Sequence, residues 1–228
     1  MTLKNGVMKY LSWRAQIQNK YYHLLIVLIA FFFIVPFSMS KEIRYFVFPL
    51  MFLSGILFSL RALEVKRSVF IMIASTGTLA VFLALLFEFF NISVFGAILH
   101  EIPIVIYASF LSMSIVLLII KMFSLSKVTS DTIAGGISVY LLLGFLWTVL
   151  YYAIYILDPR AFNFSSQFNE YSLFYFSFST LTTLGYGDIY PVNKLAMSFS
   201  NLEVITGQMY IAIFISRLVG LHIAISRK

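Results

Sequence analysis

Long apolar stretches separated by short polar connections dominate this chain. Six of them reach the roughly 20 residues that a helix needs to cross a bilayer. A seventh apolar run, Tyr171–Thr183, has only 13 residues and ends next to glycines, which predicts a re-entrant segment. The pattern therefore predicts an all-α membrane protein with six transmembrane helices, a re-entrant helix and a loop after it. The predicted spans are Tyr21–Ser38, Tyr45–Leu63, Ser68–Phe90, Phe95–Phe123, Thr132–Leu157 and Lys194–Ile225.

Composition agrees with this class and excludes others. The 228 residues are 61% hydrophobic and 11% charged, whereas about a quarter of an ordinary soluble domain is charged. The absence of cysteine excludes disulfides and thiolate metal sites. We find no nucleophile, metal-ligand or phosphate-binding pattern, so we expect neither an enzyme nor a bound cofactor.

The basic residues are distributed unevenly between alternate connections. Twelve of the sixteen Lys and Arg fall on one side of the predicted spans. This asymmetry places both termini in the cytoplasm by the positive-inside rule, with the cell membrane as the expected location. The net charge of +7 is thus explained by topology and predicts no nucleic-acid partner. The four on the outer side are Lys41, Arg44, Arg160 and Lys194.

The chain divides at a short polar connection, residues 124–131. Before this connection, we expect residues 1–20 to form a cytoplasmic or interfacial segment and residues 21–123 to form a four-helix transmembrane region. The fourth span lacks the basic residue at every third position that a voltage sensor needs, since its ionisable residues are His100, Glu101 and Lys121. Strong voltage sensing is therefore not expected. Residues 132–228 form the second unit, a helix, a re-entrant loop and a helix.

The loop of that second unit holds the most informative motif, Thr182-Thr183-Leu184-Gly185-Tyr186-Gly187-Asp188. Two glycines flanking a tyrosine permit a strip of backbone whose carbonyls all face one way. Such a strip needs alternating left- and right-handed backbone angles, and glycine adopts the left-handed ones freely. Four strips around one axis would form rings of oxygen able to replace the water around a cation.

From Thr132 to Lys228 the chain resembles the pore domain of the potassium channel family, whose filter reads Thr-Val-Gly-Tyr-Gly. The resemblance implies an outer helix over 132–157, a pore helix over 171–182, a filter over 183–187 and an inner helix over 194–225. It implies Asp188 at the outer mouth. It also implies K⁺ ligation by the Thr183 hydroxyl and by the carbonyls of Thr183, Leu184, Gly185 and Tyr186, with Gly187 closing the filter.

Several side chains are predicted to support this filter. Aromatic residues of the pore helix, including Tyr175 and Phe176, are expected to form a cuff around it. Glu203 is a carboxylate inside a span, which marks a functional site. It is expected to support the filter from behind by pairing with Thr180 or Thr182, or to face the cavity, with an interface hydrogen bond as the alternative. Leu184 and Ser179 depart from the residues usual in the family.

The inner helix carries the predicted cavity and gating residues. Gly207 lies twenty residues after Gly187, the spacing of the family's gating hinge, although a close-packing role remains open. Gln208, Ile211 and Ile215 share one helical face and are expected to line the cavity below the filter.

The sequence therefore predicts a subunit of a homotetrameric potassium channel that conducts K⁺ passively across the lipid bilayer. Two alternatives stay open. A weakly selective cation channel is suggested by the bulk of Leu184. A non-conducting membrane scaffold would instead retain the filter motif without its activity.

Overall fold

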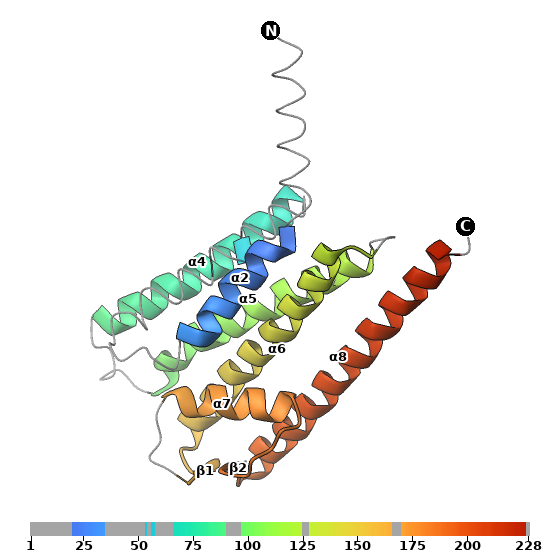
Figure 1. The fold of residues 1–228 in the computed structure, drawn as a ribbon. Helices are drawn as coiled ribbons and strands as arrows, with labels where there is room; N and C mark the ends of the chain where they lie inside the picture. The colour runs from blue at the N-terminus through green and yellow to red at the C-terminus, as the bar shows by residue number, and fades with distance from the viewer. Residues whose placement is uncertain are drawn as a thin grey trace.

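The structure is a computed structural model that describes residues 20–34, 53, 56–57, 66–89, 97–124, 128–165 and 170–226. Within these residues the chain forms six helices and two short strands (Figure 1). They are α2 (Lys20–Ile34), α4 (Arg67–Phe89), α5 (Ala97–Phe123), α6 (Ser130–Leu157), β1 (Phe162–Phe164), α7 (Glu170–Leu181), β2 (Ile189–Pro191) and α8 (Lys194–Ser226).

Three helices of the described part are long and apolar enough to span a bilayer, and they lie in α5, α6 and α8. The apolar parts of α2 and α4 are shorter, at 21–34 and 67–83. The predicted second span, 45–63, lies almost entirely outside the described residues, as does the predicted N-terminal segment before residue 20. The chain is thus a mostly helical integral membrane protein.

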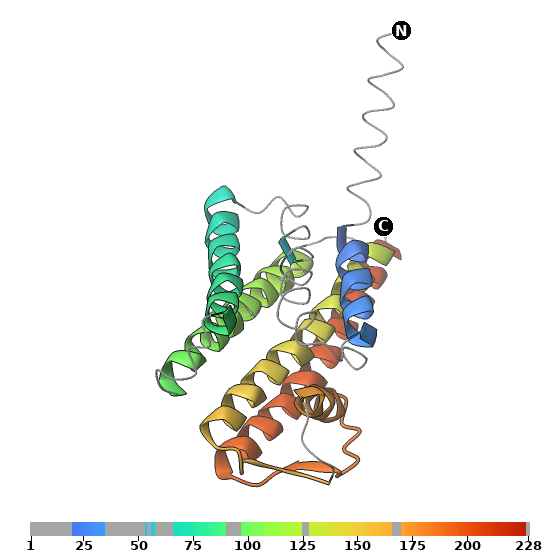
Figure 2. The same cartoon turned by 90° about the vertical axis from the view of Figure 1, so that its left-hand side faces the viewer.

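Helix α6 is the central element of the structure. Helices α2 and α5, which precede α6 in the chain, pack on it, and so do α7 and α8, which follow it. Helix α4 packs on α5, and Figure 2 shows α4 apart from α7 and α8. The outward faces expose large apolar side chains, such as Ile26, Phe82 and Val105. Lipid is a suitable solvent for these faces, and water is not.

Two glycines let other helices approach α6 closely. A Cβ atom at Gly136 would lie 2.0 Å from the ring of Phe214 on α8, and one at Gly144 would lie 2.4 Å from the ring of Phe178 on α7. Both rings therefore occupy space that any larger residue on α6 would fill. Small residues at helix contacts are typical of membrane proteins, where close packing replaces the hydrophobic effect.

The start of α6 is also fixed to α2. Thr129 and Thr132 form a capping box at the α6 N-terminus. Next to it, the Asp131 carboxylate accepts a hydrogen bond from the backbone N–H of Tyr21, at 2.9 Å. A negative charge at the first turn of α2 is favourable because unpaired N–H groups and the helix dipole converge there.

The two strands are a feature that the all-α prediction missed. β1 and β2 pair antiparallel, with Asn163 opposite Tyr190. Each strand has three residues, which is too short for alternation of apolar and polar positions to be recognised in the sequence. The pair joins the segment after α6 to the segment just before α8, at one end of the molecule (Figure 1).

Candidate functional site

The glycine-tyrosine strip has the backbone geometry that the sequence predicts. Thr183, Gly185 and Gly187 have positive φ angles of 60°, 56° and 81°. Leu184 and Tyr186, which lie between them, do not have positive φ. The handedness thus alternates along five residues. A Cβ atom at Gly185 or Gly187 would meet nothing within 4 Å, so glycine is required there by the backbone angle and not by crowding.

The amide groups of the strip are held by the end of α7. The Leu184 N–H donates to the Ser179 carbonyl at 2.8 Å, and the Gly185 N–H donates to the Ser179 hydroxyl at 3.1 Å. In a planar trans peptide the C=O points opposite to the N–H. The carbonyls of Thr183 and Leu184 therefore point away from α7. The Thr183 hydroxyl donates to the Thr182 carbonyl at 2.6 Å, which leaves its oxygen lone pairs as acceptors.

The far end of the strip is fixed by β1 and the residue after it. The Asp188 carbonyl accepts two hydrogen bonds from Ser165, one from the backbone N–H at 2.9 Å and one from the hydroxyl at 2.7 Å. The Asp188 side chain is exposed. Sequence reasoning missed Ser165 because its role depends on the β1–β2 pairing, and strands of three residues give no recognisable signal in the sequence.

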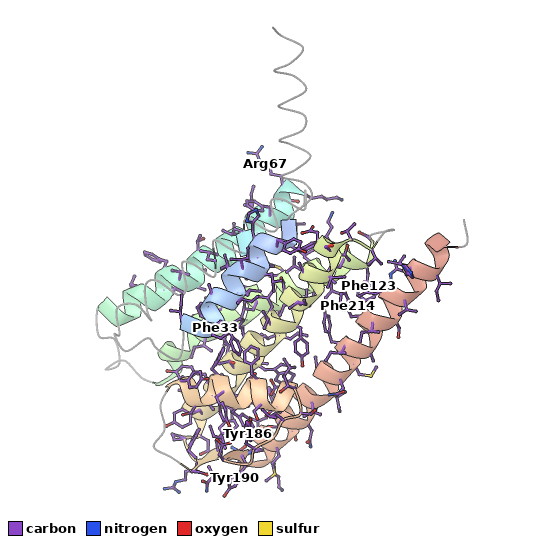
Figure 3. The ribbon with its side chains drawn as sticks, viewed as in Figure 1. Phe33, Arg67, Phe123, Tyr186, Tyr190 and Phe214 are labelled. Carbon is purple, nitrogen blue, oxygen red and sulfur yellow. The ribbon has the colours of Figure 1, made fainter. Side chains whose placement is uncertain are left out.

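The aromatic residues of α7 do not form a single cuff around the strip within the chain. The Tyr175 ring stacks on the Tyr186 ring, with the ring centroids 6.3 Å apart and an interplanar angle of 3°. Phe176 instead packs against Tyr151 and Phe162. Phe176 therefore supports α7, whereas Tyr175 contacts the strip itself. Tyr186 and Tyr190 are labelled at this end of the molecule in Figure 3.

Glu203 is fully buried, and the partners expected for it were wrong. The Tyr151 hydroxyl donates to its Oε2 at 2.5 Å, and the Ser177 hydroxyl lies 2.7 Å from its Oε1. Thr182 instead caps its own helix by donating to the Phe178 carbonyl at 2.6 Å. With no exposed surface in the single chain, the Glu203 side chain does not face a cavity. It joins α8 to α6 and α7.

Gly207 is a close-packing position. A Cβ atom there would lie 2.5 Å from the Leu181 carbonyl oxygen and 2.9 Å from the Leu181 Cδ1. Helix α8 is also uninterrupted across Gly207. The inner helix thus touches the last turn of α7, directly before the strip.

Gln208, Ile211 and Ile215 are all exposed in the single chain, as the cavity prediction requires. They lie on a face next to the packed one, because α8 directs Gly207, Tyr210 and Phe214 toward its neighbours. The Tyr210 hydroxyl donates to the Gly136 carbonyl at 2.8 Å. The helix therefore has one face packed on its own chain and another left open.

Arg217 connects α8 to the N-terminal half of the chain. Its Nη2 donates to the carbonyl of Phe123, the last residue of α5, at 3.0 Å. Figure 3 labels Phe123 and also Phe214, which belongs to α8. A cation at a helix C-terminus interacts favourably with the unpaired carbonyls there.

Comparison with known proteins identifies this part of the chain. Residues 136–222, which run from α6 through α7 and the strip into α8, match the family model described as "Ion channel". No curated protein and no solved structure matches the chain significantly. The matched region is therefore an ion-channel pore domain, a family of channels and not of enzymes. The described residues contain no group of three His, Cys, Asp or Glu that could hold a metal ion.

Proposed function

We propose that this chain is a subunit of a potassium-selective channel that conducts K⁺ passively through a tetrameric pore. The observation that carries the proposal is the strip 183–187, whose φ angles alternate in sign while its first amides are bonded to Ser179. Potassium is a hard cation that prefers oxygen ligands, and neutral carbonyls bind it weakly enough to release it. Thr183, Leu184, Gly185 and Tyr186 are the proposed ligands.

Four copies of the chain are needed because one strip supplies only one side of each oxygen ring. A cyclic homotetramer places four strips around one axis. The exposed fractions of Leu184 and Tyr186 are 56% and 68%, and that of Ile215 is 54%. Assembly would cover the first two side chains, while Ile215, with Gln208 and Ile211, would line the cavity below them.

The electrostatics of the pore unit favour a cation. The C-terminal end of α7 lies next to the strip, and the helix dipole gives this end a partial negative charge. Asp188 adds a carboxylate at the other end, which we propose is the outer mouth. Both features attract a cation without holding it in a fixed cage.

The remaining assignments form part of the same proposal. Residues 21–123 form a four-helix region with four spans, residues 124–131 a linker, and residues 132–228 the pore domain, with both termini in the cytoplasm and the cell membrane as location. Six spans in total satisfy this topology. Helix α5 contributes Lys121 as its basic residue, so the four-helix region is not a charged voltage sensor.

The proposal is tested by K⁺ and Na⁺ flux into liposomes containing the purified protein. Gly185→Ala should abolish selective K⁺ flux, because a left-handed angle costs an L-residue about 1–2 kcal/mol in each chain. Gly220→Ala is the matched control, since Gly220 lies on α8 in open space without a positive φ. Equal K⁺ and Na⁺ flux in the unmodified protein would favour a weakly selective cation channel. No flux from correctly assembled protein would favour a scaffold.

A further inference from the structure

Among the buried residues that the structure describes, Glu203 is the one acidic or basic residue. Its exposed fraction is 0%, and its hydrogen-bonding partners in the described part of the chain are two hydroxyls, those of Tyr151 and Ser177. A buried carboxylate without a cation loses its hydration and gains no ion pair in return. The tyrosines that face it, Tyr151 and Tyr140, both belong to α6 and carry no positive charge in either protonation state.

The number of protons available around Ser177 indicates whether the Glu203 carboxyl is protonated. The Ser177 hydroxyl has one proton, yet its oxygen lies 2.7 Å from Glu203 Oε1 and 2.9 Å from the Gly144 carbonyl oxygen. An ionised carboxylate and a carbonyl are both acceptors only. With Glu203 ionised, one of these two short contacts would therefore contain no proton.

Protonation of Glu203 supplies the missing proton. The carboxylic acid then donates through Oε1 to Ser177, and Ser177 donates to the Gly144 carbonyl. Tyr151 donates to Oε2 at 2.5 Å. Each of the three contacts then holds one proton.

We propose that Glu203 is a protonated, uncharged carboxyl that positions the pore helix by joining α6, α7 and α8 in one hydrogen-bonded chain. The effect on conduction rests on the proposed channel function, whereas the protonation state does not. Ser177 lies two residues before Ser179, the residue that holds the amides of Leu184 and Gly185. Because Ser177 and Ser179 lie on the same short helix, the Glu203 proton thus helps to fix the position of the strip.

Infrared spectroscopy of the reconstituted protein tests the protonation directly. The carbonyl stretch of a protonated carboxylic acid is separate from the stretches of a carboxylate, so we expect such a band at neutral pH that disappears in Glu203→Gln. Asp158→Asn is the control and should keep the band, because Asp158 lies beyond α6 and bonds Asn193. A spectrum unchanged by Glu203→Gln would overturn the proposal. Loss of the band in a protein without K⁺ flux would uphold it while contradicting the channel function.

Flux measurements test the positioning role. The Gln side chain can donate to Ser177 and accept from Tyr151 as a neutral carboxyl does, so Glu203→Gln should keep K⁺ flux within about threefold of the unmodified protein. Glu203→Leu removes both bonds and should abolish selective flux. Because that variant could fail to assemble, Ser177→Ala serves as a milder test, with an expected loss of about fivefold or more. A loss in Glu203→Gln as large as in Ser177→Ala would overturn the positioning role.

Discussion

Replacing Gly207 by alanine should separate the inner helix from the end of the pore helix. The added Cβ atom would lie 2.5 Å from the Leu181 carbonyl oxygen, whereas ordinary van der Waals contact begins at 3.4 Å. One of the two backbones must therefore move by about 0.9 Å. Overpacking of this kind costs about 1–3 kcal/mol per chain. The displaced carbonyl belongs to the residue just before Thr182, so both stability and K⁺ selectivity should fall.

The helix-propensity part of this change can be measured separately. Alanine stabilises a helix interior by roughly 1 kcal/mol relative to glycine, which opposes the packing cost at Gly207. Gly220→Ala has the same propensity term without any close contact. The difference in unfolding free energy between the two variants therefore isolates the packing cost, which we expect to be about 1–3 kcal/mol. Thermal or denaturant unfolding of the reconstituted protein gives both values.

Leu181→Ala tests whether the backbone carbonyl is the obstacle. Trimming Leu181 removes the Cδ1 atom that lies 2.9 Å from the added Cβ, but it leaves the carbonyl oxygen in place. The double variant with Gly207→Ala should therefore recover little of the lost stability. Equal stability of Gly207→Ala and Gly220→Ala would refute the packing argument. It would leave the hinge role of Gly207 as the better explanation.

Three further outcomes are expected. Ser165→Ala removes one of the two hydrogen bonds to the Asp188 carbonyl, and Ser165→Pro removes both. K⁺/Na⁺ selectivity in flux assays should therefore fall further in the proline variant. Equal selectivity in the two variants would contradict a role of these bonds in fixing the strip. The chain has no cysteine, so a thiol reagent would modify only an introduced one. A charged thiol reagent should reduce K⁺ flux in Gln208→Cys but not in Met209→Cys, because Met209 is exposed on another face of α8. Equal loss of flux in both variants would exclude the proposed cavity face. Arg217→Gln loses the bond to α5 and should raise open probability in single-channel recordings. Ser216→Ala is its control because the Ser216 hydroxyl bonds its own helix.

The parts of the site that are local in sequence could be predicted. The strip is five consecutive residues, and two of its three positive φ angles fall on its glycines. The helix positions follow from apolar length, so α6 and α8 differ from their predicted bounds by two residues or fewer. Both features depend on residues that are close together in the sequence, so a single sequence is enough to predict them.

The contacts between distant segments could not be predicted in the same way. Glu203 was expected to meet Thr180 or Thr182, yet it meets Ser177 and Tyr151. Ser177 and Thr180 are three residues apart on α7, so they are close to the same helical face. The crossing of α8 over α7 decides between them. That crossing depends on how far Gly207 lets the two helices approach.

One face of α8 explains why these contacts occur together. Glu203, Gly207, Tyr210, Phe214 and Arg217 follow one another at spacings of four, three, four and three residues, which keeps them on one stripe of a helix. Along about 21 Å of helix, the stripe meets first α7, then α6, and finally the end of α5.

A hydropathy pattern does not reveal this stripe, because its residues are an acid, a glycine, two aromatic residues and an arginine, which differ in hydropathy. Their neighbours differ: two hydroxyls meet the acid, the Leu181 carbonyl meets the glycine, Gly136 of α6 meets both aromatic residues, and the end of α5 meets the arginine. An outward movement of α8 must break these contacts. At its Arg217 end α8 is hydrogen-bonded to the last residue of α5, whereas at its Glu203 end the carboxyl is fully buried between α6 and α7. Movement of α8 should therefore begin at Arg217 and leave the filter end in place.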